Sequence, residues 1–242
     1  SQRGHTEIVR LLLEHGADIN IRDEDRKTAL LYAIQLGRTE IVKLLLENGA
    51  DPNTANTINS PLIFATQRGR TEIVKLLLDA GAKPNMPDKS RRTALIEASR
   101  MGHTDIVKLL LDAGADINVR ASALMVASYM DNIAIVRLLL ADGANPNIQD
   151  EVGITALMEA SLNIAIVRLL LDAGAKPNLQ NEEGETALMY ASRRGRTDIV
   201  QLLLDSGADP NIRNEDGDTA LMWASQRGHT EIVRLLLEHG AD

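Results

Sequence analysis

The fold is decided by the stretch Thr230-Glu231-Ile232-Val233-Arg234-Leu235-Leu236-Leu237-Glu238-His239-Gly240-Ala241-Asp242. The same residues stand at Thr6–Asp18, and close variants recur between these two copies. The apolar segments of the variants are Ile41–Leu46, Ile73–Leu78, Ile106–Leu111, Ile135–Leu140, Ile166–Leu171 and Ile199–Leu204. A self-similar chain of this kind indicates a repeat array. Such arrays usually bind a partner that their sequence does not name.

The composition limits the classes of protein and of chemistry. Hydrophobic residues make up 44% of the 242 residues and aromatic residues only 2%, so we expect an aliphatic core. The absence of cysteine excludes disulfides, thiolate metal sites and a cysteine nucleophile. The net charge of −8 disfavours phosphate-backbone binding, so we predict no nucleic-acid partner. Short apolar runs and the lack of a signal-peptide pattern predict no membrane association and an intracellular, cytoplasmic location.

One complete unit, residues 23–55, shows how the repeat is built. A polar turn precedes Thr28, which is a suitable N-cap for a short first helix. Gly37 ends that helix, and Thr39 can cap a second helix with an apolar stripe at helical spacing. Gly49 is expected to end the second helix in the left-handed conformation. Two short helices cannot cover both faces of their leucine stripes, so the units must stack on one another.

At this point the sequence resembles the ankyrin-repeat family, whose unit of about 33 residues is a β-turn followed by two antiparallel helices. The residues that carry the resemblance in one unit are Thr186-Ala187-Leu188, Ala191, Gly195, Asp198-Ile199-Val200, Leu202-Leu203-Leu204, Gly207-Ala208-Asp209 and Asn211. The resemblance covers essentially the whole chain and implies an all-α solenoid of stacked helix-turn-helix units with β-hairpin turns. The family's Thr-Pro-Leu-His is mostly Thr-Ala-Leu-Met here, with only Pro61 retained, so we expect less rigid turns.

The resemblance places one ankyrin-repeat array over residues 1–242. Its expected units are a partial 1–22, then 23–55, 56–87, 88–120, 121–149, 150–180, 181–213 and 214–242. The third segment lacks one residue near Asn56–Asn59, the unit 121–149 lacks a hairpin tip, and the unit 150–180 lacks about two residues after Ser161. Two interpretations stay open for the last two units: an altered local geometry, or residues missing from the printed chain.

The resemblance also implies where a partner binds, namely the concave side formed by hairpin tips and first helices. Aromatic residues and arginine are enriched in binding hot spots. We therefore predict a partner-binding surface whose members share these elements: Tyr32, Gln35, Leu36, Phe64, Arg68, Glu97, Arg100, Met101, Tyr129, Met130, Glu159, Glu183, Glu185, Tyr190, Arg193, Arg194, Asp216, Asp218, Trp223 and Arg227. The alternative is that the aromatic members only fill space between first helices.

The hairpin tips are sorted by charge, which could steer a partner of opposite polarity. The early tips are basic (Arg26, Lys27, Lys89, Arg91, Arg92), and the late tips are acidic (Asp150, Glu151, Glu182, Glu183, Glu185, Glu215, Asp216, Asp218). Solubility alone could also explain these charges. For the scattered histidines and for the series Met125, Met158, Met189 and Met222 we expect packing roles, with metal binding and an interaction ridge as the alternatives. Asn53, Asn118 and Asn211 resemble family positions modified by an asparaginyl hydroxylase, and we expect turn hydrogen bonds there instead.

We therefore predict a non-catalytic protein–protein interaction scaffold with no cofactor, no metal and no catalytic residue. Its partner is an unidentified protein, and the scaffold itself is expected to be a monomer. Two alternatives remain open: an engineered or structural array made for stability or head-to-tail assembly, since Ser225–Asp242 repeats Ser1–Asp18, or an ankyrin segment of a larger effector or enzyme.

Overall fold

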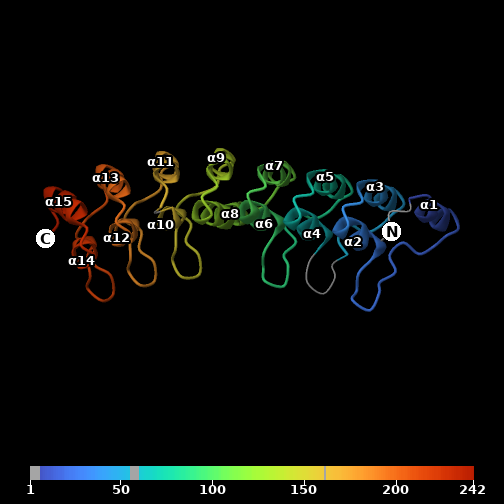
Figure 1. Ribbon diagram of the computed structural model, residues 1–242, viewed down its shortest axis with the longest axis horizontal. Coiled ribbons are helices and arrows are strands. Elements are labelled where there is room, and N and C mark those ends of the chain that lie inside the picture. The colour runs from blue at the N-terminus through green and yellow to red at the C-terminus, as the bar shows by residue number, and fades with distance from the viewer. Residues whose placement is uncertain (1–5, 55–59, 161) are drawn as a thin grey trace. The chain divides into compact units, whose positions relative to one another are not determined.

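The structure is a computed structural model that describes residues 6–54, 60–160 and 162–242. These residues form helices and turns with no strand among them, which confirms the all-α class. The chain divides into two compact units, residues 1–119 and residues 120–242. In each unit the first helices of the repeats form one row, the second helices form another, and the hairpins project from the first-helix row (Figure 1).

Unit 1 contains three complete helix pairs after an initial second helix. Each first helix packs against its own second helix, and helices of the same kind pack against their neighbours. The first helices are α2 (Ala29–Gln35), α4 (Pro61–Gln67) and α6 (Ala94–Met101). The second helices are α1 (Thr6–Glu14), α3 (Thr39–Glu47), α5 (Thr71–Asp79) and α7 (Thr104–Asp112). The missing residue predicted in the turn near Asn56–Asn59 lies outside the described residues.

Unit 2 is built in the same way, with the helix α8 (Ile117–Tyr129) containing the division between the units. Its other first helices are α10 (Ala156–Glu159), α12 (Ala187–Arg193) and α14 (Ala220–Gln226). Its second helices are α9 (Ile133–Ala141), α11 (Ile164–Asp172), α13 (Thr197–Asp205) and α15 (Thr230–Glu238). The stretch that is repeated at Thr6–Asp18 and Thr230–Asp242 therefore forms a second helix, once as α1 and once as α15.

The second helices supply most of the large aliphatic side chains of the core, as their repeated sequence predicts. Ile41, Val42 and Leu45 are at most 2% exposed, and the equivalent residues of α5, α7, α9, α11 and α13 are buried in the same way. Burying each such side chain contributes about 1.5–3 kcal/mol. Three of the four predicted packing methionines, Met125, Met158 and Met189, are also buried, which confirms their role.

The predicted helix cap is right for the first helices and wrong for the second. The Thr28 hydroxyl accepts a hydrogen bond from the Leu31 amide, and Ser60, Thr93, Thr155, Thr186 and Thr219 cap their helices equivalently. Thr39, in contrast, is already the first residue of α3, and the cap position belongs to Arg38, whose side chain makes no capping bond. The tight turn that begins at Gly37 moves the helix start one residue ahead of the expected place.

Asparagine side chains connect the end of each regular repeat to the next. Asn53 Nδ2 donates to the Gly81 carbonyl at 3.1 Å, and its Oδ1 accepts from the Lys83 amide at 2.8 Å. The same pair of bonds is made by Asn20 and Asn85 in unit 1 and by Asn147, Asn178 and Asn211 in unit 2. The predicted hydrogen-bonding role is thus confirmed for Asn53 and Asn211. Asn118 differs because it lies inside α8.

Both predicted short units depart locally from the regular repeat. The unit without a hairpin tip replaces it by helix, since α8 begins at Ile117, ahead of the expected boundary at residue 121. In the next unit α10 is only four residues long, and Asn163 caps α11 with its side chain. In both units the shortened sequence coincides with a helix that is shorter or longer than in the regular repeat. Ser161 itself lies outside the described residues.

Candidate functional site

The candidate site of each unit lies where a hairpin meets its first helix. An Asp or Asn at the base of the hairpin accepts backbone hydrogen bonds with its Oδ1, and we pair it with the residue nine positions later on the first helix. The base residues are Asp23, Asp88, Asp150, Asn181 and Asn214, and their partners on the first helices are Tyr32, Glu97, Glu159, Tyr190 and Trp223. The residues at these two positions determine whether the surface of a repeat is aromatic, cationic or acidic.

The first pair in unit 1 is an aspartate that accepts a hydrogen bond from a tyrosine hydroxyl. The Tyr32 hydroxyl donates to Asp23 Oδ2 at 2.5 Å, and Lys27 Nζ lies 5.6 Å from the centre of the Tyr32 ring. This hydrogen bond lowers the pKa of Asp23 and raises the pKa of Tyr32. The aromatic ring is half-buried and has its polar end satisfied, so it forms a fixed, partly exposed contact area.

The second pair is two carboxylates bridged by an arginine. Glu97 is fully buried, with Arg92 Nη1 3.0 Å from its Oε1 and Arg100 Nη2 2.7 Å from its Oε2. Arg92 also reaches Asp88, whose Oδ2 is 3.0 Å from Arg92 Nη2. Gln67 Nε2 of α4 also donates to Glu97 Oε2. Glu97, which the sequence predicts as a binding residue, therefore links two repeats internally and offers no exposed atom.

In unit 2 the equivalent region is an aromatic and cationic stack. The Arg193 guanidinium lies 5.0 Å from the Tyr190 ring centre and 5.1 Å from that of Trp223, and it pairs with Glu185 at 2.7 Å. The Arg194 guanidinium lies 5.3 Å from the centre of the Tyr190 ring. Burial and the nearby Glu185 charge raise the pKa of Tyr190. Glu185 is only 4% exposed, so it positions Arg193 from within and is not itself a surface residue.

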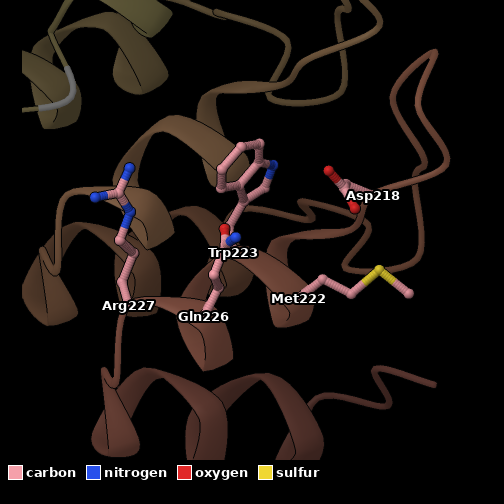
Figure 2. Close-up of a pocket in the computed structure, with 5 residues that line it drawn as sticks. All are labelled: Asp218, Met222, Trp223, Gln226 and Arg227. Carbon is pink, nitrogen blue, oxygen red and sulfur yellow. The ribbon is translucent and has the colours of Figure 1, made fainter.

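A hollow of about 630 Å³ adjoins this stack on α14. It is lined by Asp218, Met222, Trp223, Gln226 and Arg227, with the indole standing between the hairpin residue Asp218 and Arg227 (Figure 2). The indole Nε1 is buried without a hydrogen-bond partner, and Met222 is 45% exposed. Met222 therefore departs from the packing role expected for its series.

A smaller cavity of about 260 Å³ lies between α8, the hairpin that begins at Asp150, and α10. Its wall is formed by Ser122, Met125, Val126, Tyr129, Asp150 and Glu159. Burial raises the pKa of Glu159, and Asp150 adds to this, while the positive charge of Arg194 acts in the opposite direction. The half-buried Glu159 and the exposed Asp150 therefore line one cavity together with apolar side chains of α8.

The remaining predicted residues lie in different environments. Leu36, Met101, Tyr129 and Met130 are exposed, with Tyr129 the most exposed at 67%. Arg68 covers the Phe64 ring at 5.4 Å. Gln35 and Asp218 are half-buried, and Glu183, Asp216 and Arg227 are exposed. Of the predicted set, Glu97 and Glu185 are the two whose side chains are buried.

Sequence reasoning missed the packing partner of the histidines. The His103 ring lies against Gly69 and the His229 ring against Gly195, so that a side chain at either glycine would meet the ring at 3.0 Å or less. This supports the expected packing role, whereas His5 lies outside the described residues. No group of histidine and acidic residues in the described part of the chain could hold a metal ion. None of the helices described is long and apolar enough to cross a membrane.

Comparisons with known proteins agree with this geometry. The family description "Ankyrin repeats (3 copies)" matches residues 1–56, 55–121, 120–181 and 157–242. Among solved structures, the chain is similar to the ankyrin repeat domain of Bcl-3, described as a unique member of the IkappaB protein family. The two are 32% identical with a TM-score of 0.76, over 87% of this chain and 100% of that chain. A comparison with curated proteins gives no match. Ankyrin repeats generally mediate protein–protein interactions and are generally not catalytic.

Proposed function

This chain belongs to the ankyrin-repeat family, and from that premise we propose that it is a protein-interaction scaffold whose hairpins and first helices bind the partner. The observation that carries the proposal is the stack of Arg193 between Tyr190 and Trp223, 5.0 and 5.1 Å from their ring centres. Arginine and aromatic side chains supply most of the energy of protein interfaces. Here they are held in place before a partner arrives, which reduces the entropy lost on binding.

The surroundings of the stack support this role. Glu185 fixes the guanidinium from inside, and Asn181 Nδ2 donates to the Tyr190 hydroxyl at 3.2 Å. Arg194 lies beside Tyr190, and Arg227 lines the same hollow as Trp223. Both arginines are exposed, as are Asp216 and Glu183 of the hairpins. A partner on this surface meets apolar rings flanked by both signs of charge. Charges around such a surface set orientation and association rate more than affinity.

The test compares protein capture by the wild type and by the double variant Arg194→Glu/Trp223→Ala, with captured proteins identified by mass spectrometry. A specific partner should be lost, because truncation of a hot-spot residue typically costs about 2 kcal/mol, more than tenfold in affinity. The matched control is Arg168→Glu on the second helix α11, which changes an exposed charge in the same unit. Equal loss of the partner in both variants would contradict the proposed surface, provided circular dichroism shows both folded.

A further inference from the structure

The same pair of carboxylates is built twice in this chain. Asp88 and Glu97 in unit 1 and Asp150 and Glu159 in unit 2 are each nine residues apart, with the aspartate at the hairpin base and the glutamate on the first helix. The aspartate amides make the same hairpin bond, Asp88 to the Arg92 carbonyl at 2.8 Å and Asp150 to the Ile154 carbonyl at 3.0 Å. Each aspartate also accepts backbone amide bonds with Oδ1. The two pairs are therefore equivalent in the fold.

The pair in unit 1 is occupied by a guanidinium. Arg92, four residues after Asp88, approaches Asp88 Oδ2 with Nη2 at 3.0 Å and with Nε at 3.1 Å. Its Nη1 lies 3.0 Å from Glu97 Oε1. One planar group thus joins both carboxylates, the geometry for which a guanidinium is better suited than an ammonium. This repeat demonstrates what kind of cation the paired carboxylates accept.

The pair in unit 2 has the carboxylates without that arginine. The residue four positions after Asp150 is Ile154, and the α10 helix ends at Glu159, before the place that corresponds to Arg100. In place of a guanidinium there is the cavity of about 260 Å³ lined by Asp150, Glu159 and the α8 side chains Met125, Val126 and Tyr129. Arg194 of α12 acts on Glu159, but burial outweighs its influence, as the raised pKa of Glu159 shows.

The cavity has the size and the wall for one long side chain. Drug-sized ligands occupy pockets of roughly 300–1,000 Å³, so 260 Å³ is suited to a smaller group. The aliphatic stem of an arginine can lie along Met125 and Val126, as such stems do on apolar surfaces. The exposed ring of Tyr129 offers a cation–π contact at the rim. The repeat before the Asp150 hairpin has α8 in place of a hairpin tip, so the Asp150 hairpin has no hairpin of the preceding repeat beside it.

We propose that the cavity between Asp150, Glu159 and α8 binds the guanidinium of an arginine side chain presented by a partner polypeptide, as Arg92 fills the equivalent place in unit 1. The proposal rests on the scaffold function proposed above and names the chemistry of one contact. The guanidinium of the partner's arginine pairs with the two carboxylates, and its aliphatic stem covers Met125. The contact adds specificity for a basic residue to a surface otherwise dominated by the Arg193 stack.

The test uses methyl NMR of the full chain labelled at its seven methionines, titrated with the blocked tripeptide acetyl-Ala-Arg-Ala-amide. Met125 lines the cavity, and Met222, which lines the other hollow, is the internal control. We expect a saturable shift of the Met125 methyl with a dissociation constant of roughly millimolar, because a half-exposed ion pair contributes little. Met222 should not shift. The citrulline tripeptide, with the same shape and no charge, should not bind.

Two variants decide the assignment. The double variant Asp150→Asn/Glu159→Gln should bind about tenfold more weakly or not at all, since charged hydrogen bonds are lost. Ile154→Arg should place an internal guanidinium where Arg92 stands in unit 1, shift Met125 without peptide, and block peptide binding. Glu238→Gln, which removes an exposed charge on the second helix α15, is the matched control.

The proposal is overturned if the Met125 methyl does not shift, if citrulline or lysine tripeptides bind equally well, or if Ile154→Arg leaves binding unchanged. Such a failure is distinct from failure of the scaffold function. A partner that is still lost in the Arg194→Glu/Trp223→Ala variant would keep the scaffold and remove only this cavity from it.

Discussion

The hairpins 88–92 and 150–154 occupy equivalent places in their repeats and solve the same turn differently. In the first, Arg91 adopts the left-handed conformation at φ 59°, whereas the second has Gly153 at φ 80°. The first fills its carboxylate pair with Arg92, and the second has Ile154 there and an open cavity. The two hairpins thus differ in the residue at the left-handed position and in what lies between the two carboxylates.

The glycine is required because another hairpin follows closely. The Glu182 amide donates to the Val152 carbonyl at 3.0 Å, and a Cβ on Gly153 would lie 2.7 Å from Asn181 Cα. The repeat that follows the one containing the hairpin 88–92 begins with α8, which has helix in place of a hairpin tip. Arg91 can therefore carry a side chain at the cost of left-handed strain, about 1 kcal/mol. The helices of the repeats are thus alike, whereas the residue that a hairpin position tolerates depends on whether another hairpin packs against it.

The largest effect in this comparison is expected from Arg92→Met. It removes one cation from the fully buried Glu97 and from Asp88, while Arg100 still pairs with Glu97. We expect a loss of roughly 3 kcal/mol in the free energy of unfolding, the lower end for breaking a buried pair. Urea unfolding followed by circular dichroism measures it. Adding Glu97→Gln should restore part of the loss, and a wild-type midpoint for Arg92→Met would show that the ion pair carries no stability.

A smaller loss is expected from Gly153→Ala. The new Cβ meets the backbone of Asn181 at 2.7 Å, and the residue keeps a positive φ, so we expect roughly 2 kcal/mol of destabilisation. The matched control is Arg26→Ala in the hairpin 23–27. The native residue there already has a Cβ at a positive φ of 61°, so the variant should keep a stability near that of the wild type. Thermal or urea unfolding of the two variants, side by side, gives the difference. Equal effects would mean that the close approach of the hairpins does not exist in solution.

The smallest effect is expected from Glu159→Gln, and it depends on pH. Burial raises the pKa of Glu159 in the folded state above its ordinary value. The folded chain then binds more protons than the unfolded chain, so the stability of the wild type falls as pH rises through this window. The variant should be slightly more stable than the wild type at neutral pH and lose this advantage below the ordinary glutamate pKa of about 4.3. The measurement is the unfolding midpoint of both proteins from pH 3.5 to 7. A difference between the two midpoints that stays constant over this range would show that Glu159 is not desolvated.

The repeat pattern was sufficient for much of the structure. The spacing of Ile41, Leu44 and Leu45 predicts the buried face of α3, and Thr28 predicts a helix start, because both depend on contacts within a few residues. Thr39 was misplaced by one residue because the cap depends on the preceding tight turn. The aromatic and arginine positions predict a candidate surface, but the buried state of Glu97 and Glu185 depends on Arg92, Arg100 and Arg193, whose conformations no periodicity encodes.

The sequence by itself determined the family, the two helices of each repeat and the side from which side chains such as Tyr190 and Trp223 project, since these follow from local propensity and a repeated apolar stripe. Only the tertiary structure decided that Asp88 and Glu97 share an arginine while Asp150 and Glu159 line a cavity. The spacing of nine residues was visible in both pairs, but a carboxylate becomes a core link or a binding group according to what the neighbouring repeat places around it.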